Sequence, residues 1–403
     1  MKIKRPDVLF LPKWYPHRWD PFDGNFVENH AHAIKQIASL KILFVHSDDQ
    51  LSDRLYDFDE KSNQGILELR VYFKRSNSGI GLLDRLLNFI RYRKAQQLGY
   101  EKLYPKSEPD LCHVHVLARS SLLAIKLKKE KGIPFAISEH WSGYLPQSGA
   151  LKASRKSPYY RRIANQASGI HTVTQQLAKA MKGHGIRNQF TVIPNVVDTD
   201  LFHHEQNLVK MPKSTRQKQD TKGLIQILFV GNLLQHPKRI LDIIQIFARI
   251  SKVRQDFILH IYGEGRDEGR MLLMIRDMGI QSHVEFHGTT DRKGVAEAMK
   301  RAHFLFLYSE FENQPCVINE ALCCGCPVVV PDIEGIVEFM EEDFGLLFTR
   351  LKALEFENAI LKMMDSHSDY DRKKISQVAA KKFDEASIAE SFKQFYQSIL
   401  AER

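Results

Sequence analysis

The chain has 403 residues, of which 43% are hydrophobic and 26% are charged, and its formal net charge is +10. These values are those of a soluble globular protein, and the length exceeds what one ordinary core needs, so we expect two domains. No apolar run reaches the roughly 18 residues of a membrane-spanning helix, and the amino terminus lacks a secretory signal, so we expect a cytoplasmic protein.

Short apolar runs rich in β-branched and aromatic residues alternate with longer amphipathic runs through most of the sequence. This alternation predicts parallel sheets wrapped by helices. The strands expected in the first half are DVLFL, KILFVH, DLCHVHV, IPFAIS and GIHTVT. Helical spacing occupies residues 25–39, 81–104 and 120–131. We therefore predict a doubly wound, Rossmann-like α/β domain at residues 1–203.

The alternation stops in a polar, basic stretch without periodicity and then starts again. Residues 204–222 are interpreted as a linker or hinge segment. The strands expected in the second half are IQILFVG, FILHIYG, VEFHG, HFLFLYS and CPVVV. Beyond Thr349 the pattern is wholly helical. A second Rossmann-like domain is thus predicted at residues 223–385, followed by a final helix at 386–403.

Positive charge is concentrated in the first half, where residues 1–200 hold 31 Lys and Arg against 19 Asp and Glu. This asymmetry fits an anionic lipid, a phosphorylated acceptor or nucleic acid, or alternatively a solubilising face. Stacking aromatics interleaved with basic residues are missing, which argues against nucleic acid. Residues 79–100 combine leucines and aromatics with arginines, and 154–162 add a basic cluster. They predict an interfacial membrane helix or a core helix with a basic outer face.

The stretch from Tyr308 to Gly335 places Glu312 before a helix and Glu320 inside it. The helix is expected to begin at Pro315, because proline at the first helical position loses no hydrogen bond. Its amino terminus then lies at the carboxyl edge of the sheet and suits a phosphate. Glu320 lies among apolar neighbours, so its carboxylate needs partners. These are ribose hydroxyls or, in a purely structural role, a Lys or Arg.

Together with other motifs, this stretch resembles the retaining nucleotide-sugar glycosyltransferases of family 4, which have the GT-B architecture of two facing Rossmann-like domains. The hallmark is supplied by Glu312, Glu320, Ala321, Gly325, Pro327 and Val328. The other matching motifs are WYP...DGNFVENHA (14–31), HVH (113–115), SEHWSGY (138–144), VIPNVVDTDLF (192–202), LFVGNLL...KR (228–239), IYGEG (261–265), VEFHG (284–288) and EGIVE (334–338). The resemblance spans nearly the whole chain, in the family's order.

The resemblance implies roles for single residues. Glu312 would contact donor-sugar hydroxyls, and Glu320 would hold the nucleotide ribose. The diphosphate would be held by Lys238 and by Arg239, because Asn232 stands where the family has an arginine. A lysine-arginine pair after a strand is otherwise a solvated helix start. The remaining donor-binding positions are at the start of the helix: Asn313, Gln314, Pro315, Cys316 and Val317.

Further positions come from the same resemblance. Gly24 falls on the family's glycine-bearing loop, or is a plain turn glycine, and Gly288 would let the base approach the backbone. His140 matches a histidine near the reacting sugar, although a lone histidine is often structural. Asn195 and Asp198 belong to the turn that ends the first domain. The final helix, as in relatives, would pack back on the first domain.

The implied reaction is transfer of a hexose from a UDP-, GDP- or ADP-sugar to a glycan or lipid-linked acceptor, with retention of configuration. It fits the synthesis of cell-envelope polysaccharide or glycolipid, in the cytoplasm or at the inner face of the membrane.

No cofactor and no catalytic metal are expected. The DxD look-alikes 57–59 and 198–200 lie in an acidic surface run and a turn, and the cysteines between 316 and 326 lack the companion histidines of a zinc site. In GEGRDEG, the third glycine comes one residue too late for a dinucleotide fingerprint, which argues against a dehydrogenase. A GT-B nucleotide-sugar epimerase and a non-catalytic basic binding protein for membrane surfaces or nucleic acid stay open as alternatives.

Overall fold

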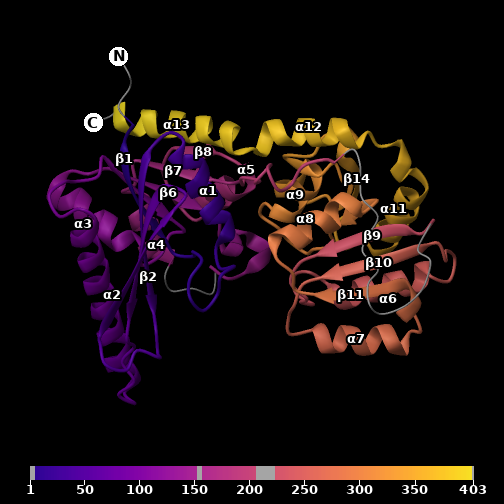
Figure 1. Cartoon of the computed structure of the whole chain (residues 1–403), viewed down its shortest axis with the longest axis horizontal. Helices are drawn as coiled ribbons and strands as arrows, with labels where there is room; N and C mark the ends of the chain where they lie inside the picture. Colours follow the sequence, from indigo (N-terminus) through magenta and orange to yellow (C-terminus); the bar gives the residue numbers. More distant parts are fainter. Residues whose placement is uncertain (1–4, 152–156, 206–222, 402–403) are drawn as a thin grey trace. The chain divides into compact units, whose positions relative to one another are not determined.

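A computed structural model describes residues 5–151, 157–205 and 223–401. The chain divides into two compact units, shown in Figure 1. Unit 1 comprises Met1–Val196 and Glu385–Arg403, and unit 2 comprises Val197–Asp384. The segment predicted as a linker, 204–222, lies outside the described residues except for its first two positions.

Unit 1 is built on one eight-stranded sheet with the order β3-β4-β2-β1-β5-β6-β7-β8. Its strands are β1 (Asp7–Pro12), β2 (Ser39–Ser47), β3 (Tyr56–Asn63), β4 (Ile66–Phe73), β5 (Leu111–His115), β6 (Phe135–Glu139), β7 (Gly169–Thr172) and β8 (Phe190–Val192). All neighbours are parallel except β3 and β4, which pair antiparallel. Since a parallel sheet is covered on both faces, its strands are apolar almost throughout.

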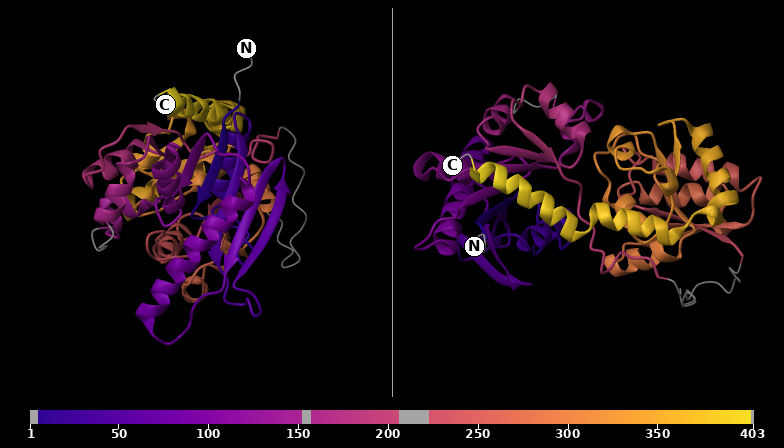
Figure 2. Two further views of the ribbon diagram at one scale, coloured as in Figure 1. Left: turned by 90° about the vertical axis from the view of Figure 1, so that its left-hand side faces the viewer. Right: turned by 90° about the horizontal axis from the view of Figure 1, so that it is seen from above.

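Helices cover both faces of this sheet. They are α1 (Asn25–Lys35), α2 (Gly81–Leu103), α3 (Ser121–Lys131), α4 (Ser157–Ala164), α5 (Gln175–Gly183) and α13 (Glu385–Ala401). Alternate residues of β1 point to opposite faces. Leu9 packs in a core with α2, α3, α4 and α5, whereas Phe10 packs in a core with α1 and α13. Figure 2 shows α13, in yellow, lying along unit 1 although it comes last in the sequence.

The run Asp57–Asp59 corrects one prediction. We predicted an acidic surface run there, and Phe58 and Glu60 are exposed, but the run forms β3 and Asp57 is buried. The Asp57 carboxylate is buried and pairs with Arg18 at 2.7 Å. An acidic run can enter a strand because the opposite charge comes from a residue distant in sequence, which a local pattern does not reveal.

Unit 2 contains a six-stranded parallel sheet with the order β11-β10-β9-β12-β13-β14. The strands are β9 (Ile225–Val230), β10 (Phe257–Tyr262), β11 (Val284–Gly288), β12 (Phe304–Phe306), β13 (Val328–Pro331) and β14 (Gly345–Phe348). The helices are α6 (Ile240–Ile250), α7 (Glu268–Asp277), α8 (Arg292–Arg301), α9 (Cys316–Cys323), α10 (Glu334–Val337), α11 (Ala353–Ser366) and α12 (Arg372–Phe383). Short 3₁₀ turns are η3 (Gln281–His283), η4 (Glu342–Phe344) and η5 (His367–Asp369) in unit 2, and η1 (Ser142–Tyr144) and η2 (Pro146–Ser148) in unit 1.

The strand order of unit 2 creates a switch point between β9 and β12. From β9 the chain first adds β10 and β11 on one side and then returns to add β12, β13 and β14 on the other. The loops that leave β9 and β12 therefore diverge to opposite faces of the sheet. In open α/β sheets, ligands bind in the crevice that such diverging loops leave at the carboxyl edge. The two sheets of parallel strands confirm the predicted α/β, doubly wound fold class.

Candidate active site

Two ion pairs join the loops that follow β9 and β12. The Nζ atom of Lys238 lies 2.5 Å from Oε1 of Glu312, and both side chains are largely buried, with exposed fractions of 17% and 13%. Next to them, Nη1 of Arg239 lies 3.0 Å from Oε1 of Glu310. The structure thus brings Lys238 and Glu312 together at the switch point of unit 2. This arrangement can present a cation and a carboxylate to one ligand.

Arg239 is held in an unusual backbone conformation. Its φ of 56° and ψ of 35° lie in the left-handed region, which is uncommon for residues other than glycine. Its guanidinium pairs with Glu310 and also with Asp242, so its charge is shared between two carboxylates. Asn232, which occupies the position of the family's arginine, is exposed. Its side chain makes no hydrogen bond to any residue in the described part of the chain.

The start of α9 differs by one residue from the prediction. We predicted Pro315 as the first helical residue, but its ψ of 116° is extended and it caps the helix, which begins at Cys316. The Pro315 carbonyl already accepts the amide hydrogen of Ile318 at 3.1 Å. Asn313 and Gln314 just before the cap are buried. No side chain caps α9, so its first amides keep the positive end of the helix available to an anion.

Glu320 lies one turn into α9 with a carboxylate that has no close partner. Within the described residues this carboxylate makes no hydrogen bond and no ion pair within 4 Å, although the side chain is partly buried. Burial raises the pKa of the Glu320 carboxyl to about 7, Arg292 opposes the rise and Asp198 adds to it. The sequence analysis did not identify Arg292, the first residue of α8. Its place shortly after VEFHG, at the start of the helix that follows β11, was the available signal.

Two glycines of the predicted site have left-handed backbones. Gly24 caps α1 with a φ of 65°, and a Cβ atom there would lie 2.4 Å from the backbone of Trp14. The backbone conformation of Gly24 and its close contact with Trp14 therefore require a glycine at this position, with or without a bound ligand. Gly288 has a φ of 68° at the end of β11, but open space surrounds its Cβ position. A side chain at Gly288 is disfavoured by conformation and not by crowding.

His140 follows β6 in unit 1, where Glu139 organises the loop. The buried Glu139 carboxylate accepts the amide hydrogens of Leu117, His140 and Trp141 at 2.9–3.0 Å. Burial raises the pKa of Glu139, and these amide donors oppose the rise. Burial lowers the pKa of His140 well below its usual value, and a hydrogen bond with Asn195 partly opposes this. His140 is therefore a neutral base at physiological pH.

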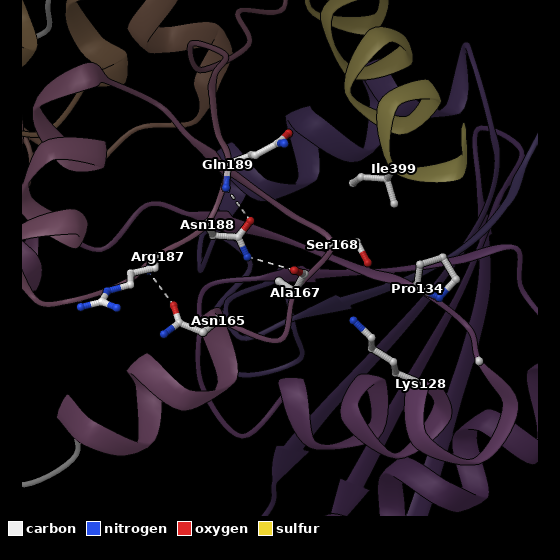
Figure 3. A pocket seen from close by; sticks show the side chains of 10 residues that line it. Lys128, Pro134, Asn165, Ala167, Ser168, Arg187, Asn188, Gln189 and Ile399 are labelled. Carbon is white, nitrogen blue, oxygen red and sulfur yellow. Dashed lines mark hydrogen bonds between the residues drawn. The ribbon is translucent and has the colours of Figure 1, made fainter. Parts of the chain in front are cut away.

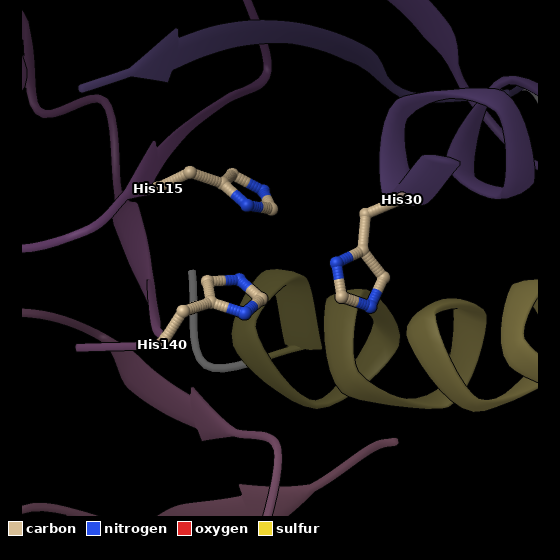
Figure 4. A group of neighbouring side chains, drawn as sticks. All are labelled: His30, His115 and His140. Carbon is tan, nitrogen blue, oxygen red and sulfur yellow. The ribbon is translucent and has the colours of Figure 1, made fainter. Parts of the chain in front are cut away.

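His30 and His115 lie beside His140, as Figure 4 shows. One nitrogen of each ring lies within 4.8 Å of the nitrogens of the other two. His115 is fully buried, and neither of its nitrogens has a hydrogen-bond partner among the residues that the structure places. Val116, which follows it, has a φ of 65°, a strained conformation for a β-branched residue. The strain at Val116 and the unpartnered buried imidazole of His115 together make this a candidate functional position, which the sequence analysis named only as the HVH motif.

A chain of hydrogen bonds ties α13 to the sheet behind this cluster. His171 Nε2 donates to the Ile193 carbonyl at 2.7 Å, so His171 Nδ1 must accept from the Ser138 hydroxyl at 2.6 Å. Ser138 then accepts from His113 Nε2 at 2.7 Å, and His113 Nδ1 accepts from the Tyr396 hydroxyl at 2.7 Å. Every donor has one acceptor. His113 and His171 are therefore structural.

Other features offer less for binding a donor. Figure 3 shows a surface pocket beside Pro134, Ser168 and Gln189, which precede β6, β7 and β8, so it lies at the amino edge of the sheet. The amide of Asn188 there donates to the Ala164 and Ala167 carbonyls and closes a turn.

The groups of side chains that could bind a metal ion in the described ranges contain no cysteine. They are His30, His115 and His140, and His260, Glu285 and His287.

None of the helices in the described ranges combines the length and the apolar content required to span a bilayer.

Comparison with known proteins places this geometry in a family. The family model described as "Glycosyltransferase Family 4" matches residues 58–201. The family model described as "Glycosyl transferases group 1" matches residues 210–382. An uncharacterized glycosyltransferase of Methanocaldococcus jannaschii is 24% identical over 64% of this chain and 66% of its own length. The lipopolysaccharide 1,6-galactosyltransferase of Salmonella typhimurium is 25% identical over 61% of this chain and 62% of its own length. The matched region thus spans less than two thirds of each relative.

The crystal structure of HepE from Anabaena in complex with UDP and glucose has a similar fold. The two structures superpose with a TM-score of 0.70 at 17% identity, over 98% of this chain and 100% of HepE. At this identity the likeness concerns the fold. Because the two matched descriptions cover most of the chain and the fold agrees over nearly all of it, the chain belongs to the group 1 glycosyltransferases and has the GT-B fold of two Rossmann-like domains.

Proposed function

We propose that this protein is a retaining glycosyltransferase that transfers a hexose from a nucleotide diphosphate sugar to a glycan or lipid-linked acceptor. The observation that carries the proposal is the meeting of Lys238 and Glu312 at the switch point, with the uncapped start of α9 beginning four residues after Glu312. A cation and helix amides suit a diphosphate, and a carboxylate suits sugar hydroxyls. In this assignment the diphosphate displaces Glu312 from Lys238, and Glu312 turns to the sugar.

Glu320 is assigned to the nucleotide ribose. A partly buried carboxylate without a close partner is costly, and two hydroxyls of a cis diol would supply the missing hydrogen bonds. Arg239 is already engaged by Glu310 and Asp242. We therefore assign the main contact with the leaving diphosphate to Lys238, and Arg239 raises the positive potential beside it. No cofactor and no catalytic metal are included in this proposal.

The acceptor is assigned to unit 1. His140 is a neutral imidazole suited to a hydroxyl near the reacting sugar, and the unpartnered nitrogens of His115 can hydrogen-bond further hydroxyls. HepE is described with UDP and glucose, which supports a nucleotide sugar as donor. A relative named as a lipopolysaccharide galactosyltransferase supports a role in envelope glycan synthesis. Because the alignments cover less than two thirds of the relatives, activity and substrates are part of the proposal.

We place the acceptor side at an anionic membrane surface because of the exposed first half of α2. Leu82, Leu86 and Ile90 follow one stripe of this helix and are 79%, 56% and 52% exposed. The stripe continues into the exposed basic residues Arg93 and Lys94. Neither has an acidic partner within 4 Å among the described residues. The second half of α2 packs in the core through Tyr100 and Leu103, so the proposed membrane contact concerns only its first half. Apolar and unpaired basic side chains on one surface suit anionic lipid.

Binding of the donor is tested first by thermal shift against UDP-, GDP- and ADP-sugars, since a ligand raises the melting temperature only if it binds the folded state. One nucleotide class is expected to stabilise the wild type and to stabilise Glu320→Gln much less. Incubating that donor with and without envelope glycan acceptors then identifies the reaction. A new epimeric nucleotide sugar formed without acceptor would replace the proposal by epimerisation, and the absence of any stabilising sugar nucleotide would contradict it.

A further inference from the structure

Three side chains that can bind a metal ion meet on the strands β10 and β11 of unit 2. The Nδ1 atom of His260 lies 3.0 Å from Nε2 of His287 and 3.5 Å from Oε2 of Glu285. The Nε2 atom of His287 lies 3.7 Å from the same carboxylate oxygen. Two imidazole nitrogens and one carboxylate oxygen thus form a compact triangle.

The backbone places these residues by an irregularity in strand pairing. His260 pairs with Glu285, and Ile261 pairs with Phe286, but Tyr262 pairs with Gly288. His287 is therefore the extra residue of a β-bulge, a device that re-aims a side chain. The Tyr262 ring stacks on the His287 ring, with centroids 4.3 Å apart and planes 6° apart. The bulge and this stacking hold His287 beside His260.

The hydrogen bonds around His260 leave a lone pair directed into the triangle. The Gln226 side-chain amide donates to the Leu224 carbonyl at 2.8 Å, which turns its oxygen toward His260 Nε2 at 2.6 Å. His260 Nε2 must therefore carry the proton, and Nδ1 keeps its lone pair. A metal ligand whose other nitrogen donates to a fixed oxygen is the usual arrangement in metal sites.

We propose that His260, Glu285 and His287 form a binding site for a divalent transition-metal ion of the zinc type. Tetrahedral zinc bonds nitrogen and oxygen at about 2.0–2.2 Å, so two of its ligand atoms are separated by roughly 3.3 Å. The three separations here, 3.0, 3.5 and 3.7 Å, bracket that value. On binding, the Nε2 proton of His287 moves to Nδ1, which gives the other neutral tautomer. The fourth position stays open to water.

The site is accessible, and none of its three ligands has a role in the proposed transfer. The Glu285 and His287 side chains are 40% and 23% exposed, so an ion can enter without unfolding the strands. Lys238, Glu312 and Glu320 supply none of its ligands. A metal there joins neighbouring strands close to Gly288, and its expected role is to stabilise the edge of the sheet. The inference does not depend on the proposed glycosyl transfer.

The test uses untagged, full-length, chelator-treated protein. Calorimetric titration with ZnCl₂ is expected to give one ion per chain, and CoCl₂ is expected to produce the visible absorption of tetrahedral Co²⁺. His287→Gln and Glu285→Gln should each weaken zinc binding at least about 100-fold. Gln226→Ala, which removes only the residue that orients His260, should weaken it about 10- to 100-fold. Glu285→Gln changes a partly exposed side chain and is expected to fold.

His283→Gln is the matched control, because His283 lies on η3 next to β11 and bonds Gln255, outside the triangle. It should bind zinc like the wild type. The proposal is overturned if folded wild-type protein binds no zinc. It is also overturned if His287→Gln and Glu285→Gln retain the ion and His115→Asn loses it, since the metal would then belong to the buried histidines of unit 1.

Discussion

Lys238 and Glu312 are 74 positions apart in sequence, yet Nζ of the first lies 2.5 Å from Oε1 of the second. The contact exists because β9 and β12 are neighbours in the sheet, so the loops that leave them meet. A lysine paired with a carboxylate before any ligand arrives keeps both charges in place. An incoming diphosphate then replaces one anionic partner of Lys238 with another.

The first prediction concerns this lysine. Lys238→Met should lower donor affinity by about 10- to 100-fold, which corresponds to the roughly 1.5–3 kcal/mol of a hydrogen bond to a charged group. Calorimetry with the stabilising sugar nucleotide measures the change. Lys252→Met, which removes an exposed lysine of the same unit, serves as the control for net charge. Equal donor affinities of wild type and Lys238→Met would contradict the assignment.

Donor binding should strengthen with rising pH through Glu320. Its pKa of about 7 means that the carboxyl is mostly protonated at pH 6 and mostly ionised at pH 8. Only the ionised form accepts two hydrogen bonds from a ribose, so affinity should increase about tenfold across this interval. The affinity should be measured with an intact sugar nucleotide at pH 6 and at pH 8. Glu320→Gln should bind weakly with little dependence on pH, and a flat profile for the wild type would reject the ribose assignment.

The same pKa affects stability in the opposite direction. A carboxyl whose pKa is raised in the folded state holds its proton more tightly there than in the unfolded chain. Its contribution to stability is therefore lost as pH rises from about 4.5 toward 7. Glu320→Gln removes this dependence, so it should be relatively more stable than the wild type at pH 8 than at pH 5. Urea unfolding monitored by hydrogen exchange within α9 measures the difference.

Tyr396→Phe should destabilise unit 1 by about 1–3 kcal/mol, because it leaves the buried Nδ1 atom of His113 without a donor. All three tryptophans, Trp14, Trp19 and Trp141, belong to unit 1, so their fluorescence reports its unfolding in urea. Gln397→Ala changes the neighbouring exposed residue on the same helix and should have little effect. If both variants unfold at the same urea concentration, the hydrogen-bond chain does not stabilise the fold.

Unit 1 should lose stability in mild acid. Burial lowers the pKa of His30 to about 4 and of His171 to about 3, from an ordinary value of 6.5. The unfolded chain then binds protons first as the pH falls, so stability is complete above pH 6.5 and declines below it. Each such histidine contributes a loss of at most about 1.4 kcal/mol per pH unit. Tryptophan fluorescence in urea at pH 7.5 and 5.5 checks this, and an unchanged midpoint would argue against buried neutral histidines.

Membrane binding is predicted to depend on the exposed stripe of α2. The double variant Leu82→Ser and Leu86→Ser should abolish sedimentation with anionic phosphatidylglycerol vesicles at low salt. Neutral vesicles should bind neither protein, and high salt should weaken binding of the wild type. Leu272→Ser with Leu273→Ser is a matched control, because these leucines are also exposed, on α7 of unit 2. Wild-type protein that stays in the supernatant with anionic vesicles would refute the prediction.

Elements whose signal is local were predictable from the sequence. The apolar run before Glu312 and the glycine at 325 delimit β12 and the end of α9, and Gly325 has the expected left-handed φ of 72°. The predicted start of α9 was wrong by one residue. Proline is tolerated both at the N-cap and in the first turn, and only the ψ angle of Pro315 distinguishes the two positions. Strand β3 was missed because the buried partner of Asp57, Arg18, is distant in sequence, and only the exposed Arg54 lies nearby.

Contacts between distant loops could not be predicted from periodicity. The pairing of Arg239 with Glu310 depends on which strands are neighbours, and the approach of Arg292 to Glu320 depends on how α8 packs beside α9. The buried histidines were recognisable as motifs on α1 and β5, but the hydrogen bond from Tyr396 of α13 to His113 joins chain segments hundreds of residues apart. Such relationships follow from topology, which a linear pattern leaves open.

The return of α13 to unit 1 has a consequence for biosynthesis. The face of the sheet that Phe392 and Tyr396 cover is translated long before the helix that covers it. At about 5–20 residues per second, a ribosome needs roughly ten to forty seconds to make the whole of unit 2 in between. During that interval the nascent first unit carries an uncovered apolar surface, and the His113 imidazole lacks its donor Tyr396. We therefore expect newly made chains to engage chaperones until the last helix emerges.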